Sequence, residues 1–469
     1  MGAHQVAQAQ VQNAYCQAST EAVAQLDTVR QSAMQGNSEA QQQYKALIGQ
    51  QAEQLRRCRN QTWPQNQAIW VRLYPCDAKP GALEALLDRI VSRGYNQVYV
   101  EVFHDGQVLL PAADNPTAWA SIVRGSGYEN TDLLAEAIAK GRERGLKVYA
   151  WLFSLNFGYS YSLRPDAEQT LAQNGRGQNS LAALAAGNAS LVNTNEVFVD
   201  PYSPQAKRDY YTLVQAVLQR QPDGALFDYI RYPLGYGGDS VASRVQDLWI
   251  YGTASQQALY ARALNQKGRD LIYRFVSQGQ ITAADLAAIN AQYPQEATPL
   301  WQGRDANSSS SLQQLQSELW FLSVAHAIQG VLDFLAMATQ PVLQQGIPAG
   351  AVFFPEANQQ VGERGYDSRL QPWDRFPSNL EWHPMAYAVC GDPSCVVAQV
   401  QRVLALAPSG TQVMPVLAGT WGQARDGHPP LENQMQALYQ AAPQITSVSH
   451  FAYSWQEPQH DRERMFCRL

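Results

Sequence analysis

The sequence predicts an α/β protein built as a (β/α)8 TIM barrel, and three observations support this fold class. From residue 67 onward, short runs rich in β-forming residues alternate with helical stretches. Eight such runs occur, which is the number of strands in a closed parallel barrel. Polar or aromatic side chains stand at the ends of these runs, where barrel enzymes keep their functional residues. An open doubly wound sheet is the alternative, but no glycine-rich phosphate loop follows the first run, which counts against a nucleotide-binding sheet.

The eight expected strands are separated by stretches whose apolar residues recur at helical spacing. We expect strands at Ile69–Leu73, Gln97–Phe103, Lys147–Phe153, Ala225–Ile230, Gly350–Phe354, Leu380–Tyr387, Gln412–Leu417 and Val448–Trp455. Between most of them we expect amphipathic helices, such as Pro80–Ser92, Thr131–Arg144, Ser203–Arg220 and Glu432–Ala442. A long helix from about Leu312 to Gln345 is expected to follow the fourth strand.

Residues 1–64 form a different kind of segment. They are rich in Gln and Ala, contain few β-formers and space their apolar residues as a helix does. We expect two helices with a break near Gly36-Asn37-Ser38, packed as a hairpin on the main domain. The barrel domain then spans residues 65–469.

Two connections are too long to be simple turns. Residues 154–202 contain Asn, Gly and Ser clusters and are expected to form a loop over the barrel mouth. Residues 234–311 are expected to be an insertion, largely helical, on the C-terminal face of the barrel. Long ordered loops on that face usually shape a substrate site.

The composition excludes several classes of function. Hydrophobic residues make up 45% of the chain and charged residues 16%, which is an ordinary globular balance. The net charge of −6 gives no basic surface for nucleic acid. No run of about 18 apolar residues appears, so we expect no membrane span. The start, Met1-Gly2-Ala3-His4, lacks the pattern of a secretion signal, and we expect that a signal has been removed there.

Six cysteines allow full pairing into disulfides. The short, turn-rich loop between Cys390 and Cys395 suits a local disulfide. Cys16 and Cys58 would staple the N-terminal helices, and Cys76 would then tie the first strand region to Cys467. Three disulfides would place the protein outside the cytoplasm, whereas the alternative is six free thiols in a cytosolic protein. No Cys/His spacing resembles a metal site.

Candidate functional residues cluster at the expected strand ends. The clearest group is the run Phe227–Pro233, where an acid, an arginine and two tyrosines follow a buried strand. Charged residues rarely occupy a core unless they are paired or used. The candidates, in strand order, are Arg72, Glu101, His104, Asp105, Trp151, Asn156, Asp228, Arg231, Tyr232, Glu356, Glu381, His383, Tyr387, Trp421, Tyr453 and Trp455.

Several acids and many aromatic rings at one mouth favour a carbohydrate site. The C–H faces of sugar rings stack on aromatic rings, and sugar hydroxyls pair with carboxylates and arginine. Glycosidic cleavage needs one protonated and one ionised carboxyl group. We therefore expect Asp228 to be catalytic, with Glu101, Glu356 or Glu381 as its partner. The remaining candidates are expected to bind the sugar, and this chemistry requires neither a cofactor nor a metal.

Each of the acids also has a structural interpretation. Asp228 is a structural acid if its role is to pair with Arg231 or Arg72, and Glu101 is one if it pairs with an arginine inside the barrel. Glu381 is structural if it lies deep in the barrel, and Glu356 if it is only a loop acid.

Three segments resemble a known family, the glycosyl-hydrolase-like family 10 barrels of bacteria, with many examples in cyanobacteria. These segments are Phe227–Pro233, the run Val98–Phe103 with Asp105-Gly106, and Pro384–Tyr387. The resemblance covers roughly residues 66–460, without the N-terminal helices and the 234–311 insertion. It implies a glycosidase acting on a bacterial polysaccharide, such as peptidoglycan glycan strands stripped of their peptides.

The resemblance also implies roles for individual residues. Asp228 matches the family acid at the end of strand four, and Tyr387 matches the tyrosine that closes strand six. Relatives often have a second acid after the first, where this chain has Tyr229. They also often have Gln at the position of Glu101 and Asp about where Leu380 stands.

We therefore expect an extracytoplasmic (periplasmic or secreted) glycoside hydrolase with a poly- or oligosaccharide substrate. The alternative is a non-catalytic glycan-binding or envelope-scaffold protein on the same barrel. An esterase or deacetylase is disfavoured, because the chain has no G-x-S-x-G elbow and no metal-ligand cluster. The sugar, the linkage and the oligomeric state are left open at this level.

Overall fold

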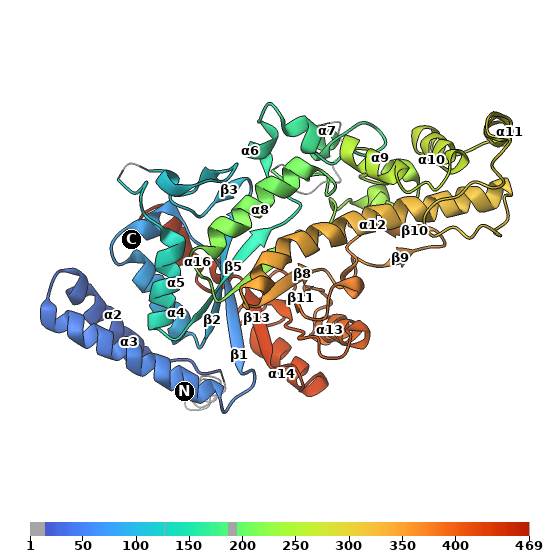
Figure 1. The fold of residues 1–469 in the computed structure, drawn as a ribbon. Coiled ribbons are helices and arrows are strands. Elements are labelled where there is room, and N and C mark those ends of the chain that lie inside the picture. Colours follow the sequence, from blue (N-terminus) through green and yellow to red (C-terminus); the bar gives the residue numbers. More distant parts are fainter. Residues whose placement is uncertain (1–14, 126, 186–194, 469) are drawn as a thin grey trace.

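A closed barrel of eight parallel strands forms the centre of the molecule. The computed structural model describes residues 15–125, 127–185 and 195–468 (Figure 1). Each barrel strand pairs in parallel with the next, and β1 pairs with both β2 and β13, which closes the sheet. The barrel order is β1 (Asn66–Arg72), β2 (Gln97–His104), β5 (Lys147–Phe153), β6 (Gly224–Asp228), β8 (Ala349–Phe353), β11 (Glu381–Ala386), β12 (Val416–Ala418) and β13 (Ser447–Phe451). The expected (β/α)8 fold is thus confirmed.

The strand register places the polar residues of the barrel at one level. Arg72 on β1 lies opposite Glu101 on β2, which in turn lies opposite Trp151 on β5. Asp228, the last residue of β6, lies opposite Phe153, two residues beyond Trp151. Because all eight strands are parallel, these residues approach the same, C-terminal end of the barrel.

Helices cover the outside of the barrel with their apolar faces. The expected helices are found, and Asp132 and Ser203 cap two of them by accepting hydrogen bonds from the amides of Ala135 and Ala206. The covering helices are α4 (Ala82–Ser92), α5 (Leu133–Glu143), α8 (Pro204–Leu218), α12 (Leu312–Gln344), α13 (Ser394–Leu406), α14 (Leu431–Ala441) and α16 (Pro458–Met465).

The expected bounds match the structure only for the third strand, and the differences at the fourth, seventh and eighth strands are the following. The fourth strand stops at Asp228 because Tyr229 takes a left-handed backbone conformation, with φ of 52°. The seventh strand is only the three residues of β12, so its expected start at Gln412 is wrong. The eighth strand was expected to reach Trp455, but β13 ends at Phe451 and the short helix α15 (Tyr453–Gln456) follows.

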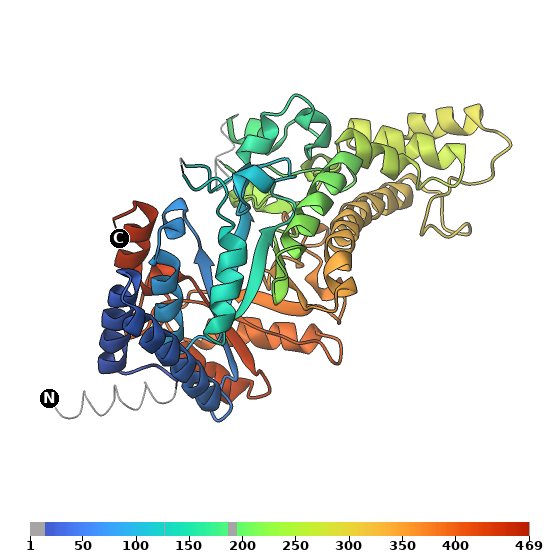
Figure 2. The same cartoon turned by 60° about the vertical axis from the view of Figure 1, so that its left-hand side comes forward.

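The N-terminal segment contains the two expected helices, α2 (Thr20–Met34) and α3 (Ser38–Arg59). The break lies where it was predicted, because Asn37 caps α3 by accepting a hydrogen bond from the amide of Ala40. The two helices share a small apolar cluster of their own. Figures 1 and 2 both show this hairpin beside α4 and on the far side of the barrel from the insertion.

A buried charge cluster holds the hairpin against the barrel. Asp88 on α4 pairs with Arg30 on α2 at 3.0 Å and with Arg144, which follows α5, at 2.7 Å. The Tyr44 hydroxyl on α3 donates to Asp88 at 2.8 Å and accepts from Arg144 at 2.6 Å. One carboxylate therefore joins two hairpin helices to two barrel helices.

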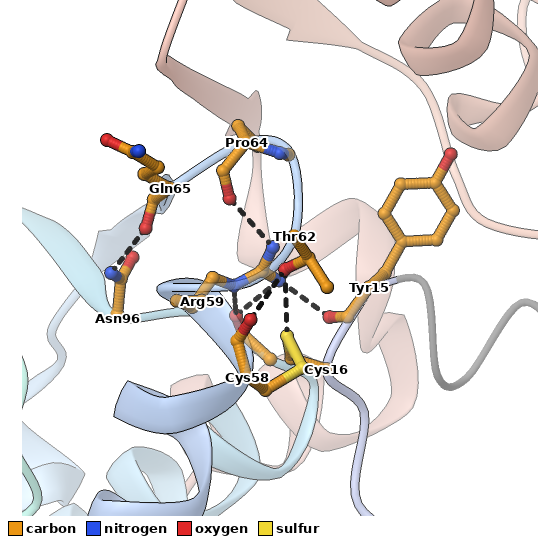
Figure 3. The surroundings of a disulfide bond; sticks show 9 residues. Tyr15, Cys16, Cys58, Arg59, Thr62, Pro64, Gln65 and Asn96 are labelled. Carbon is orange, nitrogen blue, oxygen red and sulfur yellow. Dashed lines mark hydrogen bonds between the residues drawn. A yellow bond between two sulfur atoms is a disulfide. The ribbon is translucent and has the colours of Figure 1, made fainter.

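The three expected disulfides are all formed, and no free cysteine is left in the described residues. Cys16–Cys58 ties the chain before α2 to the end of α3 (Figure 3). Beside it, the Arg59 guanidinium donates to the backbone carbonyls of Tyr15 and Pro64. Cys76–Cys467 fastens the chain end to the loop after β1, and Cys390–Cys395 closes a local loop.

Two long connections extend from the C-terminal side of the barrel. Residues 154–202 contain the short helices α6 (Tyr159–Ser162) and α7 (Ser180–Ala185). The insertion after β6 contains the helices α9 (Thr253–Tyr260), α10 (Gln266–Gln278) and α11 (Ala283–Gln292), which project from the barrel together with the start of α12 (Figure 1). Short strands complete these regions: β3 (Gln107–Val108) and β4 (Ala120–Ser121), which extend the barrel sheet beside β2, and a small sheet of β7 (Val241–Ala242), β9 (Gln360–Val361) and β10 (Gly365–Asp367).

Helix α12 alone, among the described helices, has the length and hydropathy of a membrane-crossing helix. More than half of its most apolar stretch is buried inside the molecule, as in core helices. The length and hydropathy of one helix are weak evidence for a membrane span. The sequence had predicted no span.

The charge cluster at Asp88 gives a prediction about stability. Replacing Asp88 by Ala leaves the buried Arg30 and Arg144 with only the more exposed acids Asp27 and Glu143, so the free energy of unfolding should fall by about 3–5 kcal/mol. Denaturant titration followed by circular dichroism measures this change. The control is Glu53→Ala, which removes the exposed α3 ion pairs with Arg56 and Arg57 and should leave the unfolding midpoint unchanged. An equal response of the two variants would contradict the prediction.

Candidate active site

A cavity of about 250 Å³ opens at the C-terminal ends of the barrel strands. Side chains from seven of the eight strands, or from the residues that follow them, form its wall. The wall combines three acids, two arginines and a majority of apolar and aromatic side chains, which is typical of a small-molecule site. The lining residues are Trp70, Arg72, Glu101, Asp105, Trp151, Phe153, Asp228, Tyr229, Arg231, Val352, Phe354, Met385, Tyr387 and Phe451.

Asp228 is the best-defined acid of this cavity. Its side chain is only 7% exposed, and two donors hold its two oxygens. The Trp151 indole N–H donates to Oδ2 at 3.2 Å, and the backbone N–H of Tyr229 donates to Oδ1 at 2.6 Å. The same Tyr229 has a left-handed backbone conformation and directly follows the strand. The residue after the strand therefore also supplies one of the two donors to the acid.

Burial raises the pKa of Asp228 to about 6. The donors from Tyr229 and Trp151 and the positive charge of Arg231 lower the pKa, whereas the charge of Glu101 raises it. The balance leaves a carboxyl group that is protonated in mildly acidic solution, and such a group can deliver a proton to a substrate.

Glu101 is the second buried acid at the mouth, and it is already paired. The Arg72 guanidinium donates to both of its oxygens, with a distance of 3.1 Å from Nη2 to Oε1. His104 lies 3.6 Å from Oε2, and burial lowers the pKa of this histidine. Glu101 is 1% exposed, so its charge is held inside the wall of the cavity.

Tyr229 links the cavity to the long loop over the mouth. Its ring packs on Phe153 with 4.2 Å between centroids, and the Arg231 guanidinium lies 4.5 Å above the ring. Its hydroxyl donates to Glu196 of the loop at 3.0 Å. Burial, and then the charge of Glu196, raise the pKa of Tyr229, which keeps the phenol protonated as the donor. One face of the mouth is thus an aromatic surface, held by the packing of Tyr229 on Phe153 and by its hydrogen bond to Glu196.

Two acids expected as catalytic partners lie away from the cavity wall. Glu381 begins β11, at the opposite end of that strand, where the Tyr149 hydroxyl donates to it at 3.4 Å. His383 follows it in the barrel interior, 3.4 Å from Glu381, and is fully buried. Glu356 lies in the loop after β8 and accepts a hydrogen bond from Gln399 of α13. Of the three expected partners, only Glu101 shares the cavity with Asp228.

The structure places the other expected sugar-binding residues in two groups. Arg72, Asp105, Trp151, Arg231 and Tyr387 line the cavity. The second group lies outside its lining and makes other contacts: His104 beside Glu101, Asn156 holding the amide of Val197, Tyr232 reaching the carbonyl of Ala327, Trp421 packed on Tyr15, Tyr453 bonded to His460, and Trp455 under Arg425.

Sequence reasoning missed most of the apolar wall and the loop acid Glu196. Trp70 and Phe451 point into the barrel from β1 and β13, and strand alternation from Arg72 inward would have identified Trp70. No local pattern marks Glu196, because its position depends on how the long loop folds back to Tyr229. In the described residues, no group of three or more His, Cys, Asp or Glu side chains is arranged to hold a metal ion.

Fold and site together define the class of protein: a (β/α)8 barrel whose mouth combines acids of unlike environment with aromatic rings, as in glycoside hydrolases. Comparison with family models agrees with this class. Residues 66–263 match the family described as Glycosyl hydrolase-like 10, which confirms the expected resemblance over β1 to β6. The match stops short of the expected residue 460, and it includes residues 234–263 of the insertion, which were expected to lie outside.

Comparisons with whole proteins gave distant likenesses. No curated protein matches the chain. The PgaB (BpsB) glycoside hydrolase domain from Bordetella bronchiseptica is 17% identical, covering 85% of this chain and 98% of that domain, with a TM-score of 0.48. A GH18 chitinase from Pseudoalteromonas aurantia is 10% identical over 86% of this chain and 98% of its own, with a TM-score of 0.37. A GH20 exo-β-N-acetylglucosaminidase from Vibrio harveyi is 10% identical over 87% of this chain and 54% of its own, with a TM-score of 0.42.

The hydrogen bond from Trp151 gives a prediction about the pKa of Asp228. Trp151→Phe removes a donor that stabilises the ionised carboxylate, so the pKa of Asp228 should rise from about 6 to about 7. Carboxyl ¹³C chemical shifts followed through a pH titration measure it. The control is Trp70→Phe, because the Trp70 indole lines the same cavity but donates to Ser449. An unchanged pKa in Trp151→Phe would contradict the assigned role of the indole.

Proposed function

We propose that this protein is a glycoside hydrolase that cleaves a bacterial envelope or extracellular polysaccharide, with peptidoglycan glycan strands as the first substrate to test. The observation that carries the proposal is the buried Asp228 carboxyl group, whose pKa of about 6 suits a proton donor in an aromatic-lined cavity. The family match over residues 66–263 supports the same reaction class.

In this proposal Asp228 acts as the general acid. Its proton passes to the glycosidic oxygen while the bond from that oxygen to C1 of the sugar breaks, and the electron pair of the bond goes to the oxygen. Positive charge then develops at C1, and carboxylates at the mouth stabilise it. Glu101, held in its ion pair with Arg72, would contribute a fixed charge on the side of β2.

The aromatic wall would bind the sugar rings. The ring of Trp151 lies 5.6 Å from that of Phe153 and 6.3 Å from that of Phe451, centroid to centroid, and the three rings offer apolar faces beside the acid. Such faces pack against the C–H surfaces of sugar rings. Arg231 and Tyr387 add polar groups that can hold hydroxyls at the same level.

The disulfides support a location outside the cytoplasm. All six cysteines are paired, and disulfides persist in oxidising compartments such as the periplasm or the extracellular space. A substrate in the cell envelope or beyond it agrees with that location.

Glycan binding without cleavage is the second candidate function. It is favoured by one observation: the carboxylate of Glu101 is occupied by Arg72, so the most buried partner of Asp228 is not free to act. A protein of this kind would bind oligosaccharide in the cavity and release it unchanged.

Replacing the proposed acid tests the proposed reaction. Asp228→Asn should lower kcat on purified glycan by about 10²–10⁴-fold, because the amide is too weak an acid to give its proton to the leaving oxygen. Reducing-end release measures cleavage, and calorimetry measures binding, which should persist. The control is Glu356→Gln, which changes an acid outside the cavity and should retain activity. Full activity in a folded Asp228→Asn variant would refute the assignment.

The pH dependence gives an independent prediction. The group must be protonated to act, and its pKa in the free protein is about 6. kcat/KM should therefore fall about tenfold per pH unit above about pH 6, and it should fall again in stronger acid, where the ionised carboxylate of the pair takes up a proton. Rates measured in buffers of constant ionic strength give this profile. A rate that rises through pH 6 would mean that Asp228 acts as a base instead.

A further inference from the structure

Asp105 lines the same cavity as Asp228 and directly follows β2. Among the residues that the structure describes, no hydrogen bond or ion pair engages its carboxylate. This distinguishes it from Glu101, whose two oxygens are taken by Arg72. Asp105 is also half-exposed toward the mouth, whereas Glu101 is sealed in the wall.

We propose that Asp105 is the ionised carboxylate that acts opposite Asp228 in glycosidic cleavage. This inference rests on the proposed glycosidase function and supplies the second carboxyl group that the reaction needs. Glu101, in this account, is a charge fixed beside the site and does not touch the reacting atoms.

The backbone at Asp105 holds the carboxylate in place. Strands β2 and β3 pair in antiparallel fashion with His104 opposite Gln107, so Asp105 and Gly106 form a two-residue turn. Both residues have positive φ, 45° and 75°, as a type I′ hairpin turn requires. The Ser160 hydroxyl donates to the carbonyl of Gly106 at 2.6 Å, which fastens the turn to the long loop over the mouth. The backbone that carries the Asp105 side chain is therefore held on both sides.

In this reaction Asp228 starts protonated and Asp105 starts as the ionised carboxylate. As the bond to the leaving oxygen breaks, Asp228 gives that oxygen its proton. The Asp105 carboxylate either takes a proton from water while the water oxygen forms the new bond to C1, or itself forms that bond until water, deprotonated by Asp228, displaces it. The distance between the carboxyl groups in the substrate complex selects one of these routes.

The rival explanation is that Asp105 is present only as a turn residue, because Asp-Gly is a favoured type I′ pair. Asp105→Asn separates the two, since Asn-Gly suits this turn at least as well and carries no charge. The catalytic role predicts a loss in kcat of about 10²–10⁴-fold with an unchanged thermal unfolding midpoint and nearly unchanged binding of oligosaccharide. The turn role predicts wild-type kcat, and that result overturns the inference.

Azide rescue gives a second, chemical readout. Asp105→Gly tolerates the positive φ and leaves space beside C1, so added azide should attack C1 and restore turnover with a glycosyl azide product. Glu101→Ala is the matched control and should show no rescue. Rescue of Glu101→Ala alone, or of neither variant, overturns the inference. Cleavage by the wild-type protein and equally by Asp105→Asn would refute the inference alone, whereas no cleavage by the wild type would refute the proposed function as well.

Discussion

The pairing of β1 with both β2 and β13 closes the sheet, and the arrangement of the mouth depends on this closure. Because the strands are parallel, the register brings Arg72, Glu101 and Trp151 side by side on three neighbouring strands and sets Asp228 just beyond them. An open sheet would leave Phe451 of β13 and Arg72 of β1 on edges that do not meet. The closed barrel therefore converts separate strand ends into one enclosed cavity.

Within that cavity, acids of the same type have different environments. Burial raises the pKa of Asp228 to about 6, so it favours the protonated form, whereas Glu101 is paired with Arg72. The raised pKa has a cost for folding. The folded state binds the Asp228 proton more tightly than the unfolded chain does, so proton binding stabilises the fold. This contribution to the free energy of unfolding is fully present below about pH 4 and is lost as the pH rises to about 6. Such a cost is common where function requires a buried acid.

The sequence was informative about the framework and less so about the site. Eight runs of β-forming residues locate the strands because strand and helix periods differ, and Asp228 stands out because it interrupts apolar sequence. Glu381 was included among the strand-end candidates although it stands at the start of both the expected strand Leu380–Tyr387 and the observed β11, so the strand's direction already placed it away from the mouth. Glu196 carries no local signal, since its contact with Tyr229 arises only from the course of the long loop.

The central claim is that a glycan chain lies in the mouth of the barrel with its scissile bond at residue 228. A crystal structure of the Asp228→Asn variant with a bound oligosaccharide tests this most directly. The account predicts sugar rings against the aromatic wall of Trp151 and Phe451, with a glycosidic oxygen about 3 Å from the residue-228 amide. An oligosaccharide bound elsewhere on the protein, with the cavity left empty of sugar, would contradict it.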